Sequence, residues 1–140
     1  MPPALDITIP PDTEAVARLL DALEAFAEEA ELPPKVAHRL AVVVEELAAN
    51  VAMHGGSGPG AATFVAVTVR QQDGAVIASI EDDGRAFDPL SRAAPDTEAA
   101  LEDRDVGGLG VHFVRQMTRS LDYSRADGRN RLVAVLDASG

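Results

Sequence analysis

The chain has 140 residues, a net charge of −11 and no cysteine, and these properties exclude several classes of protein. Its length suits one domain over residues 1–140, and the absence of cysteine excludes a disulfide scaffold and thiolate metal sites. The acidic balance, the short apolar runs and the lack of a signal sequence at the start favour a cytoplasmic protein that binds neither nucleic acid nor membrane directly.

Apolar periodicity and turn residues predict a mixture of helices and strands. In chain order the expected elements are a strand at residues 5–9, a helix from Asp12 or Thr13 to about Ala30, a helix that begins near Pro34, strands at residues 63–70 and 75–83, a helix at residues 109–118, and strands at residues 121–125 and 131–137. The later strands form two expected hairpins, one around Asp73 and Gly74 and one around residues 126–130. We therefore expect an α/β (α+β) fold, with about three helices on one face of a mostly antiparallel five-stranded sheet.

The long segment at residues 84–108 is polar, rich in turn residues and without an expected element. Structureless loops of this length are uncommon in compact domains, and those that occur are usually lids, binding loops or disordered segments. The segment is therefore a candidate for a functional loop.

Glu46 and Asn50 stand out in the second helix, which is otherwise largely apolar from Val42 onward. Residues four apart share one helix face, and His54 follows at the next step of four. A glutamate beside a reactive centre can act as a general base, and an asparagine oxygen is a hard ligand suited to Mg²⁺. The alternative is that Glu45, Glu46 and Asn50 form only the solvated face of an amphipathic helix.

A strand that runs into carboxylates is the second candidate. In the stretch Ile80–Pro89, Asp82 could accept a hydrogen bond from an exocyclic amino group such as that of adenine. Gly84 would let the backbone pass close to a flat ligand. The alternative is an ordinary acidic turn, since Asp-Gly is common in loops.

Glycines ahead of the third helix, Gly107, Gly108 and Gly110, are the third candidate. Backbone N–H groups at a glycine-rich helix start bind phosphate with help from the helix dipole. The spacing is neither that of a Walker loop nor that of a dinucleotide-binding fingerprint. The alternative is a flexible hinge before a helix.

Taken in order, the three motifs resemble the nucleotide site of the GHKL, or Bergerat-fold, ATPase superfamily, which includes gyrase, heat-shock chaperones, histidine kinases and mismatch-repair ATPases. The resemblance is narrower still, to the small serine/threonine kinases that act as anti-sigma factors. Three stretches carry it: EELAANVAMHGG, DDGRAFDP and GGLGVHFVRQMTRSLDYSRADGRNRLVAVL. The resemblance spans nearly the whole chain. It implies a two-layer Bergerat sandwich that binds ATP with Mg²⁺.

The resemblance also implies a role for each matching residue. Glu46 matches the general base and Asn50 the magnesium ligand, while Asp82 matches the aspartate that binds adenine. The nucleotide-binding positions carried over are Asn50, His54, Asp82, Gly84, Ala86, Phe87, Gly107, Gly108, Leu109 and Gly110. Ala86 stands where many relatives have a second glycine, and we expect nucleotide binding to survive this small replacement. Residues 91–105 would form a lid that is mobile without nucleotide and more ordered with it.

By the same resemblance, the expected activity is phosphoryl transfer from ATP to a serine or threonine of a STAS-domain antagonist in a partner-switching pathway. All three histidines fall within the expected catalytic domain, which argues against self-phosphorylation of the sensor-kinase type. The alternative is a non-catalytic module that holds ATP as a conformational ligand and sequesters a sigma factor or another regulatory partner. Homodimers are common in the family, although no feature of the sequence fixes an interface.

Overall fold

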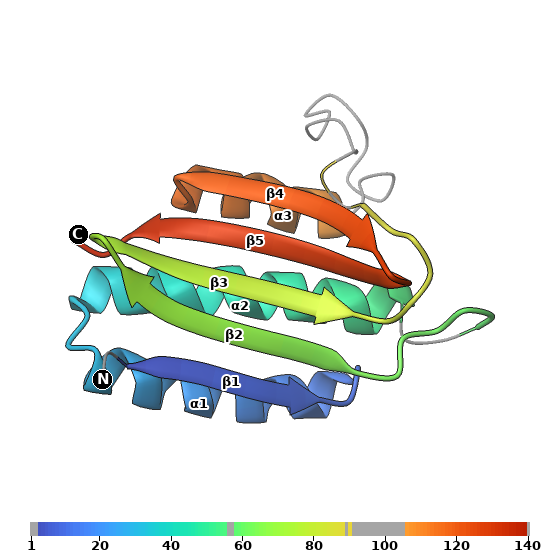
Figure 1. The fold of residues 1–140 in the computed structure, drawn as a ribbon, viewed down its shortest axis with the longest axis horizontal. Helices are drawn as coiled ribbons and strands as arrows, with labels where there is room; N and C mark the ends of the chain where they lie inside the picture. Colours follow the sequence, from blue (N-terminus) through green and yellow to red (C-terminus); the bar gives the residue numbers. More distant parts are fainter. Residues whose placement is uncertain (1–2, 56–57, 89, 91–105, 140) are drawn as a thin grey trace.

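The structure, a computed structural model, describes residues 3–55, 58–88, 90 and 106–139, with only the backbone described at residues 54–55 and 106–111. The strands of its sheet are β1 (Ala4–Ile9), β2 (Val65–Gln72), β3 (Ala75–Asp82), β4 (Ser120–Ala126) and β5 (Arg129–Asp137). Their order across the sheet is β1-β2-β3-β5-β4, and each neighbouring pair is antiparallel (Figure 1).

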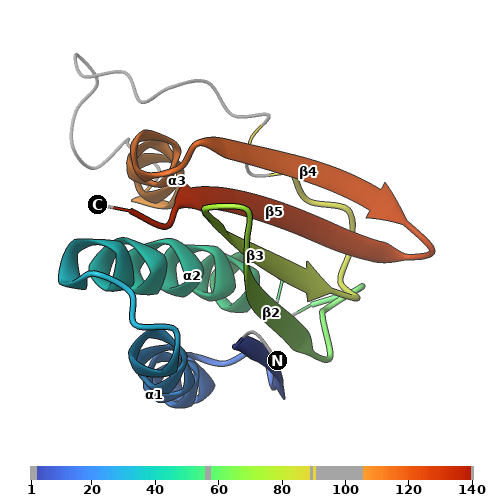
Figure 2. The same ribbon diagram turned by 60° about the vertical axis from the view of Figure 1, so that its left-hand side comes forward.

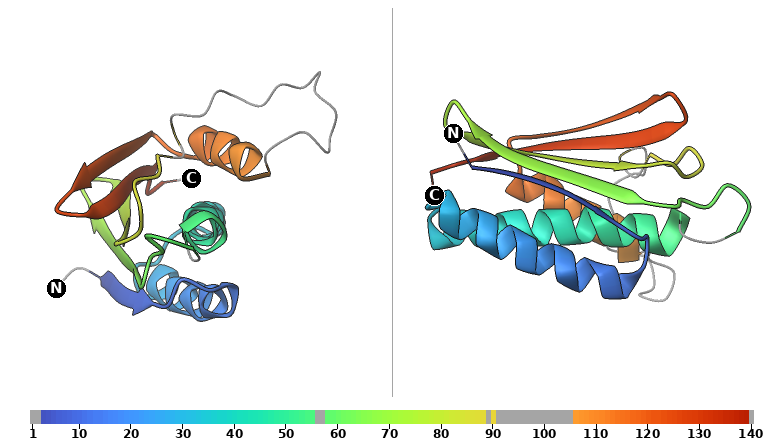
Figure 3. Two further views of the ribbon diagram at one scale, coloured as in Figure 1. Left: turned by 90° about the vertical axis from the view of Figure 1, so that its right-hand side faces the viewer. Right: turned by 60° about the horizontal axis from the view of Figure 1, so that its bottom comes forward.

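Helices α1 (Thr13–Glu29), α2 (Pro34–Gly55) and α3 (Val106–Met117) lie side by side on one face of this sheet (Figure 3). Helix α2 is the middle one, with α1 on one side and α3 on the other (Figure 2). The expected two-layer arrangement of three helices on a five-stranded sheet is confirmed. Within the described residues, no helix combines the length and apolar character that a membrane crossing requires.

The hairpin turns show why these sequences fold back where they do. Asp73 and Gly74 have φ angles of 51° and 77°, and Asp127 and Gly128 have φ angles of 54° and 75°. Positive φ at both central residues is the requirement of the tight turns that suit the twist of a hairpin, and Asp-Gly meets it at little steric cost. The second turn is therefore confined to two residues, and it is tighter than the expected turn over residues 126–130.

Helix α1 begins where the capping residue predicts. The side chain of Asp12 accepts a hydrogen bond from the backbone N–H of Ala15 at 2.7 Å, which satisfies one of the unpaired donors at the helix start. The core then fills the space between the helices and the sheet. Its largest fully buried side chains include Leu19, Leu23, Leu40, Val44, Leu47, Val67, Val69, Ile80 and Leu136.

Several element boundaries differ from the sequence-based expectation, and the starts of β2 and α3 concern the candidate site. Strand β2 begins at Val65 instead of Thr63, because the backbone N–H groups of Thr63 and Phe64 donate to the carboxylate of Asp83 at 2.6 and 3.3 Å. Helix α3 begins at Val106 instead of residue 109.

The expectation that the glycines precede α3 is therefore wrong, since Gly107, Gly108 and Gly110 lie within its first turns. A glycine costs about 1 kcal/mol relative to alanine inside a helix, which disfavours it there without excluding it. The expected lid at residues 91–105 lies outside the described residues.

Candidate functional site

Polar side chains from α2, β3 and β5 meet between the helical layer and the sheet. Asn50, Asp82 and Asn130 are only 4%, 6% and 5% exposed. They line a cavity of about 20 Å³ together with Leu47, Val51, Ile80, Phe87 and Leu132. The sheet register explains part of this meeting, because Asp82 of β3 is the paired residue of Asn130 in β5.

Asn130 fixes the orientation of the Asp82 carboxylate, and it was not among the predicted site residues. Its Nδ2 donates to Asp82 Oδ1 at 3.1 Å and to the backbone oxygen of Arg85 at 2.8 Å. Its Oδ1 accepts from the backbone N–H of Phe87 at 3.2 Å and from the Tyr123 hydroxyl at 2.5 Å. One buried amide therefore ties the end of β3, the segment that follows it and β4 into a single network.

The alternation of apolar residues along β5 indicates that Asn130 is buried. Asn130, Leu132, Ala134 and Leu136 are spaced two apart and are all buried. Side chains with this spacing share one face of a strand, so the asparagine sits on the apolar face and requires a buried hydrogen-bond partner. Its expected place in the turn at residues 126–130 conceals its position on the core face.

The backbone after β3 passes close to the segment that precedes β2. A Cβ atom added at Gly84 would lie 3.0 Å from Asp82 Oδ1 and 3.2 Å from both the nitrogen and the Cβ of Ala62. The N–H of Gly84 donates to Asp82 Oδ1 at 2.9 Å, and its carbonyl oxygen accepts from Arg125 Nη1 at 2.7 Å. In this structure, the close approach that requires glycine here is therefore to Ala62 and Asp82.

The two adjacent aspartates after β3 have separate roles. Asp83 accepts hydrogen bonds from the hydroxyl and N–H of Thr63 and from the N–H of Phe64. Burial acts to raise the pKa of Asp83, but these hydrogen bonds outweigh it and hold the pKa below its usual value. Asp83 therefore holds the chain ahead of β2, while Asp82 lines the cavity.

Asn50 is the one residue of the cavity whose polar side chain is left unsatisfied by its described neighbours. Its Nδ2 is buried and has no hydrogen-bond partner among the residues that the structure describes. An unpaired buried donor costs about 1–3 kcal/mol, so such a group calls for an explanation. A bound ligand that accepts a hydrogen bond from this amide would explain why it is buried without a described partner.

Glu46 lies one helical turn before Asn50 on α2 and is half-buried. Burial raises the pKa of Glu46, and the neighbouring Glu45 carboxylate raises it further. A carboxylate with a raised pKa is a better proton acceptor when ionised. Glu45 itself points into a different groove, between α1 and α2, so the structure separates the two adjacent glutamates.

For the remaining predicted positions, the structure gives either the exposure of the side chain or the position of the backbone. Phe87 is half-buried against the cavity, and Ala86 is exposed. His54 lies in the last turn of α2, and Gly107, Gly108, Leu109 and Gly110 lie in the first turns of α3, which packs beside α2 (Figure 2). Contact between these residues and a nucleotide stays a prediction.

The polar groups that line the cavity have the chemistry needed to contact an adenine nucleotide. The oriented carboxylate of Asp82 is an acceptor suited to an amino group, and the Asn50 amide, which has no partner among the described residues, is a donor that a ligand would satisfy. An asparagine oxygen also suits a magnesium ion that is held mainly by phosphates. Among the described residues, no three His, Asp or Glu side chains gather into a metal-binding group.

Comparison with known proteins identifies the family of the chain. Residues 9–136 match the model of the histidine kinase-like ATPase domain. The serine/threonine-protein kinase BtrW of Bordetella bronchiseptica is 32% identical over 93 residues, which is 66% of this chain, and the chain spans 65% of the length of that protein.

Solved structures show the same fold at lower identity. The structure of the RsbU and RsbW domains of a Mycobacterium tuberculosis protein has a TM-score of 0.69 at 16% identity, covering 96% of this chain and 32% of that one. A blue-light-activated histidine kinase of Erythrobacter litoralis has a TM-score of 0.59 at 18% identity, covering 94% of this chain and 42% of that one. The resemblance read from the sequence motifs is confirmed, and the chain belongs to the family of histidine kinase-like ATPase domains.

Proposed function

We propose that the chain is an ATP-dependent serine/threonine protein kinase and anti-sigma regulatory factor, whose substrate is a STAS-type antagonist in a partner-switching pathway. Family membership supports ATP as the phosphoryl donor, and the Bordetella relative is named as a serine/threonine-protein kinase. The observation that carries the proposal is the buried amide of Asn50, which has no partner in the described part of the chain and shares a cavity with the fixed carboxylate of Asp82.

Nucleotide binding follows from the residues around this cavity. Asp82, held by Asn130, accepts a hydrogen bond from the exocyclic amino group of adenine. A cavity of about 20 Å³ admits a group no larger than a water molecule, so a purine enters only when its walls move apart. Phe87 is the half-buried wall residue that lies outside the helices and strands, and its segment is the part we expect to shift.

Phosphoryl transfer then depends on position and charge. Glu46 accepts the proton of the attacking serine or threonine hydroxyl. The hydroxyl oxygen bonds to the γ-phosphorus as the bond to the bridging oxygen breaks, and ADP leaves with that electron pair. Asn50 would hold Mg²⁺, which when bound neutralises charge on the phosphates.

The test is transfer of labelled γ-phosphoryl from ATP to a STAS-domain protein of the source organism. Glu46→Gln keeps the shape of the side chain and removes the proton acceptor, so we expect transfer to fall by roughly 10²–10⁴-fold while ATP binding persists. Glu14→Gln, an exposed glutamate at the start of α1, is the matched control and should transfer at the wild-type rate.

A different result would identify a binding module without kinase activity. In that case wild type labels no partner, and Glu46→Gln captures and releases the antagonist as wild type does. Transfer by Glu46→Gln close to the wild-type rate would leave Glu46 as a residue of the helix surface.

A further inference from the structure

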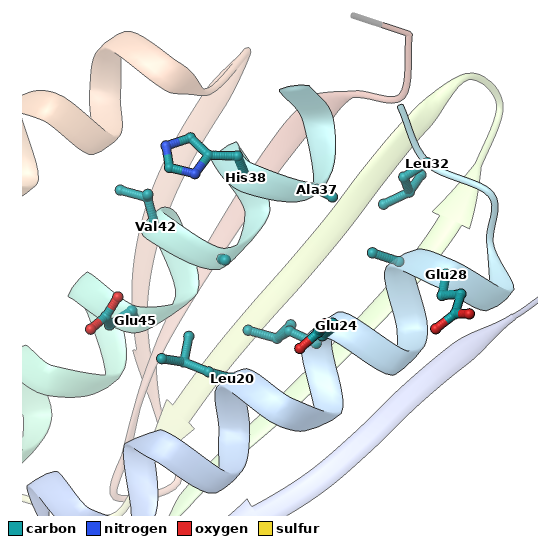
Figure 4. Close-up of a pocket in the computed structure, with 11 residues that line it drawn as sticks. Leu20, Glu24, Glu28, Leu32, Ala37, His38, Val42 and Glu45 are labelled. Carbon is teal, nitrogen blue, oxygen red and sulfur yellow. The ribbon is translucent and has the colours of Figure 1, made fainter. Parts of the chain in front are cut away.

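A second, larger hollow lies between α1 and α2. Its volume is about 580 Å³. Its apolar lining comes from Leu20, Leu32, Ala37 and Val42 (Figure 4), together with Leu23, Ala27 and Ala41. Leu20 and Val42 are only half-buried, so this part of the helical layer stays partly in contact with water. A volume of this size lies in the range of ligand-binding pockets.

Carboxylates surround this groove. Glu24 and Glu28 of α1 and Glu45 of α2 line it and are exposed (Figure 4). None of the three forms an ion pair or a side-chain hydrogen bond with a residue that the structure describes. The lysine and arginine residues of the two helices, Arg18, Lys35 and Arg39, do not line the groove, whereas the exposed His38 of α2 does (Figure 4). The groove therefore combines an apolar floor with a rim of three carboxylates and one histidine, without lysine or arginine among its lining residues.

The walls of the groove limit what can occupy it. Both walls are helices, whose backbone N–H and C=O groups are already paired within α1 and α2 away from their ends. A bound segment receives no backbone hydrogen bonds from such walls, so it has to satisfy its own, and a helix does this. Three or four apolar residues on one helix face would fill the floor.

The negative charge of the rim limits the possible occupants of the groove. A second copy of this chain placed on the groove by two-fold symmetry would bring the same carboxylates together. A membrane rich in anionic lipid would also meet this negative rim. A segment with lysine or arginine beside its apolar face would instead pair with Glu24, Glu28 and Glu45.

We propose that the groove between α1 and α2 is a docking site for a basic amphipathic helix of a protein partner. The groove and the nucleotide cavity lie on different faces of α2, with Glu45 at one and Asn50 at the other. This docking does not depend on the kinase activity proposed above. Variants of Asp82 or Asn50 therefore test the nucleotide site without removing the docking site.

The test uses labelled helical peptides and the full chain, with binding followed by fluorescence anisotropy. One peptide carries leucines at positions i, i+3, i+4 and i+7 with lysines beside them, and a second has glutamates in place of the lysines. We expect the basic peptide to bind, with weakening at high salt, and the acidic peptide not to bind. A third peptide, with serines in place of leucines, should also fail, because the groove floor is apolar.

Variants of the groove separate docking from non-specific attraction to an acidic protein. The triple change Glu24→Gln, Glu28→Gln and Glu45→Gln removes the charged rim and should weaken basic-peptide binding by about tenfold. Ala41→Phe fills the floor and should block the peptide, with circular dichroism confirming that the chain stays folded. The control Glu14→Gln removes one negative charge outside the groove and should bind the peptide like wild type.

Three results would overturn the proposal. Equal peptide binding by wild type, the triple variant and Ala41→Phe would show attraction to the whole acidic surface. Self-association that Ala41→Phe abolishes would assign the groove to a second copy of the chain. Binding to phosphatidylcholine vesicles that Ala41→Phe abolishes would assign it to a lipid surface.

Discussion

The side-chain amide of Asn130 donates to Oδ1 of Asp82 at 3.1 Å, and so fixes the buried carboxylate that faces Asn50 across the cavity. The two residues are 48 positions apart in the chain and are brought together by the pairing of β3 with β5. The same amide also holds the backbone of Arg85 and Phe87. We therefore expect both stability and ligand recognition to depend on this side chain.

Replacing Asn130 should affect both properties. Asn130→Ala removes one of the two donors to Asp82 Oδ1, the other being the N–H of Gly84, and leaves the N–H of Phe87 without its described acceptor. We therefore expect the free energy of unfolding to fall by about 1–3 kcal/mol. Nucleotide affinity should fall as well, because the carboxylate is held less firmly. Denaturant unfolding and calorimetric titration measure the two effects.

Tyr123→Phe is the control for this change, since it removes a single hydrogen bond to Asn130 and leaves the contact with Asp82. We expect it to lower the free energy of unfolding by about 0.5–1.5 kcal/mol with nucleotide affinity retained. If Asn130→Ala bound ATP as tightly as Tyr123→Phe, the orienting role of Asn130 would be wrong.

Replacing Asn50 should affect nucleotide binding without lowering stability. Its Nδ2 is unpaired among the described residues, and apolar side chains of Leu47, Val51 and Ile80 line the same cavity. We expect Asn50→Leu to keep the free energy of unfolding without nucleotide or raise it by up to about 1 kcal/mol, and to lose ATP–Mg²⁺ binding.

Leu47→Ala provides the comparison on the same helix, because Leu47 is fully buried in the core. It should lower the free energy of unfolding by about 2–5 kcal/mol. A comparable loss in Asn50→Leu would mean that Asn50 serves the fold and not a ligand.

The pH dependence of phosphoryl transfer should report on Glu46. Burial and the charge of Glu45 raise the pKa of Glu46, so the ionised form that accepts a proton is lost at a higher pH than for an ordinary glutamate. Activity should therefore decline on the acid side at that raised pKa. Glu45→Gln removes the neighbouring charge and should move the decline to lower pH.

Single-turnover rates across the acidic range measure this shift.

The pH dependence of stability that Glu46 contributes has the opposite sign to that of a salt-bridged carboxylate. The reason is that the folded chain holds the Glu46 proton more tightly than the unfolded chain does. Ionisation of Glu46 therefore lowers stability as pH rises through the raised pKa. An acid limb that is identical in wild type and Glu45→Gln would contradict the coupling of the two carboxylates.

Local patterns predicted most of the fold because they act over a few residues. The Asp12 cap, the Asp73-Gly74 turn and the apolar stripes of the helices each specify a structure that forms near them in the chain. The placement of Asp82 on the core side and Asp83 against Thr63 was not predictable in this way. It depends on the segment before β2 lying beside the turn after β3.

Asn130 shows the same limit within the candidate site. Its position in an Asp-Gly turn region suggested a loop residue, while its function in the network comes from the pairing of distant strands. Glu46 and Asn50 could be found because helical spacing places residues four apart on one face. The groove that Glu45 lines could not be predicted from the sequence, because it forms only when α1 packs against α2.

The most direct test of the nucleotide site is a calorimetric titration of the wild-type chain with ATP–Mg²⁺ and with GTP–Mg²⁺, repeated on Asp82→Asn. The Asp82 carboxylate can accept from the amino group of adenine, where guanine presents a carbonyl oxygen, so GTP should bind more weakly by a few kcal/mol. Asp82→Asn can present a donor to that amino group and should weaken ATP binding sharply. Comparable affinities for ATP and GTP in wild type would contradict the assignment of Asp82 as the residue that recognises adenine.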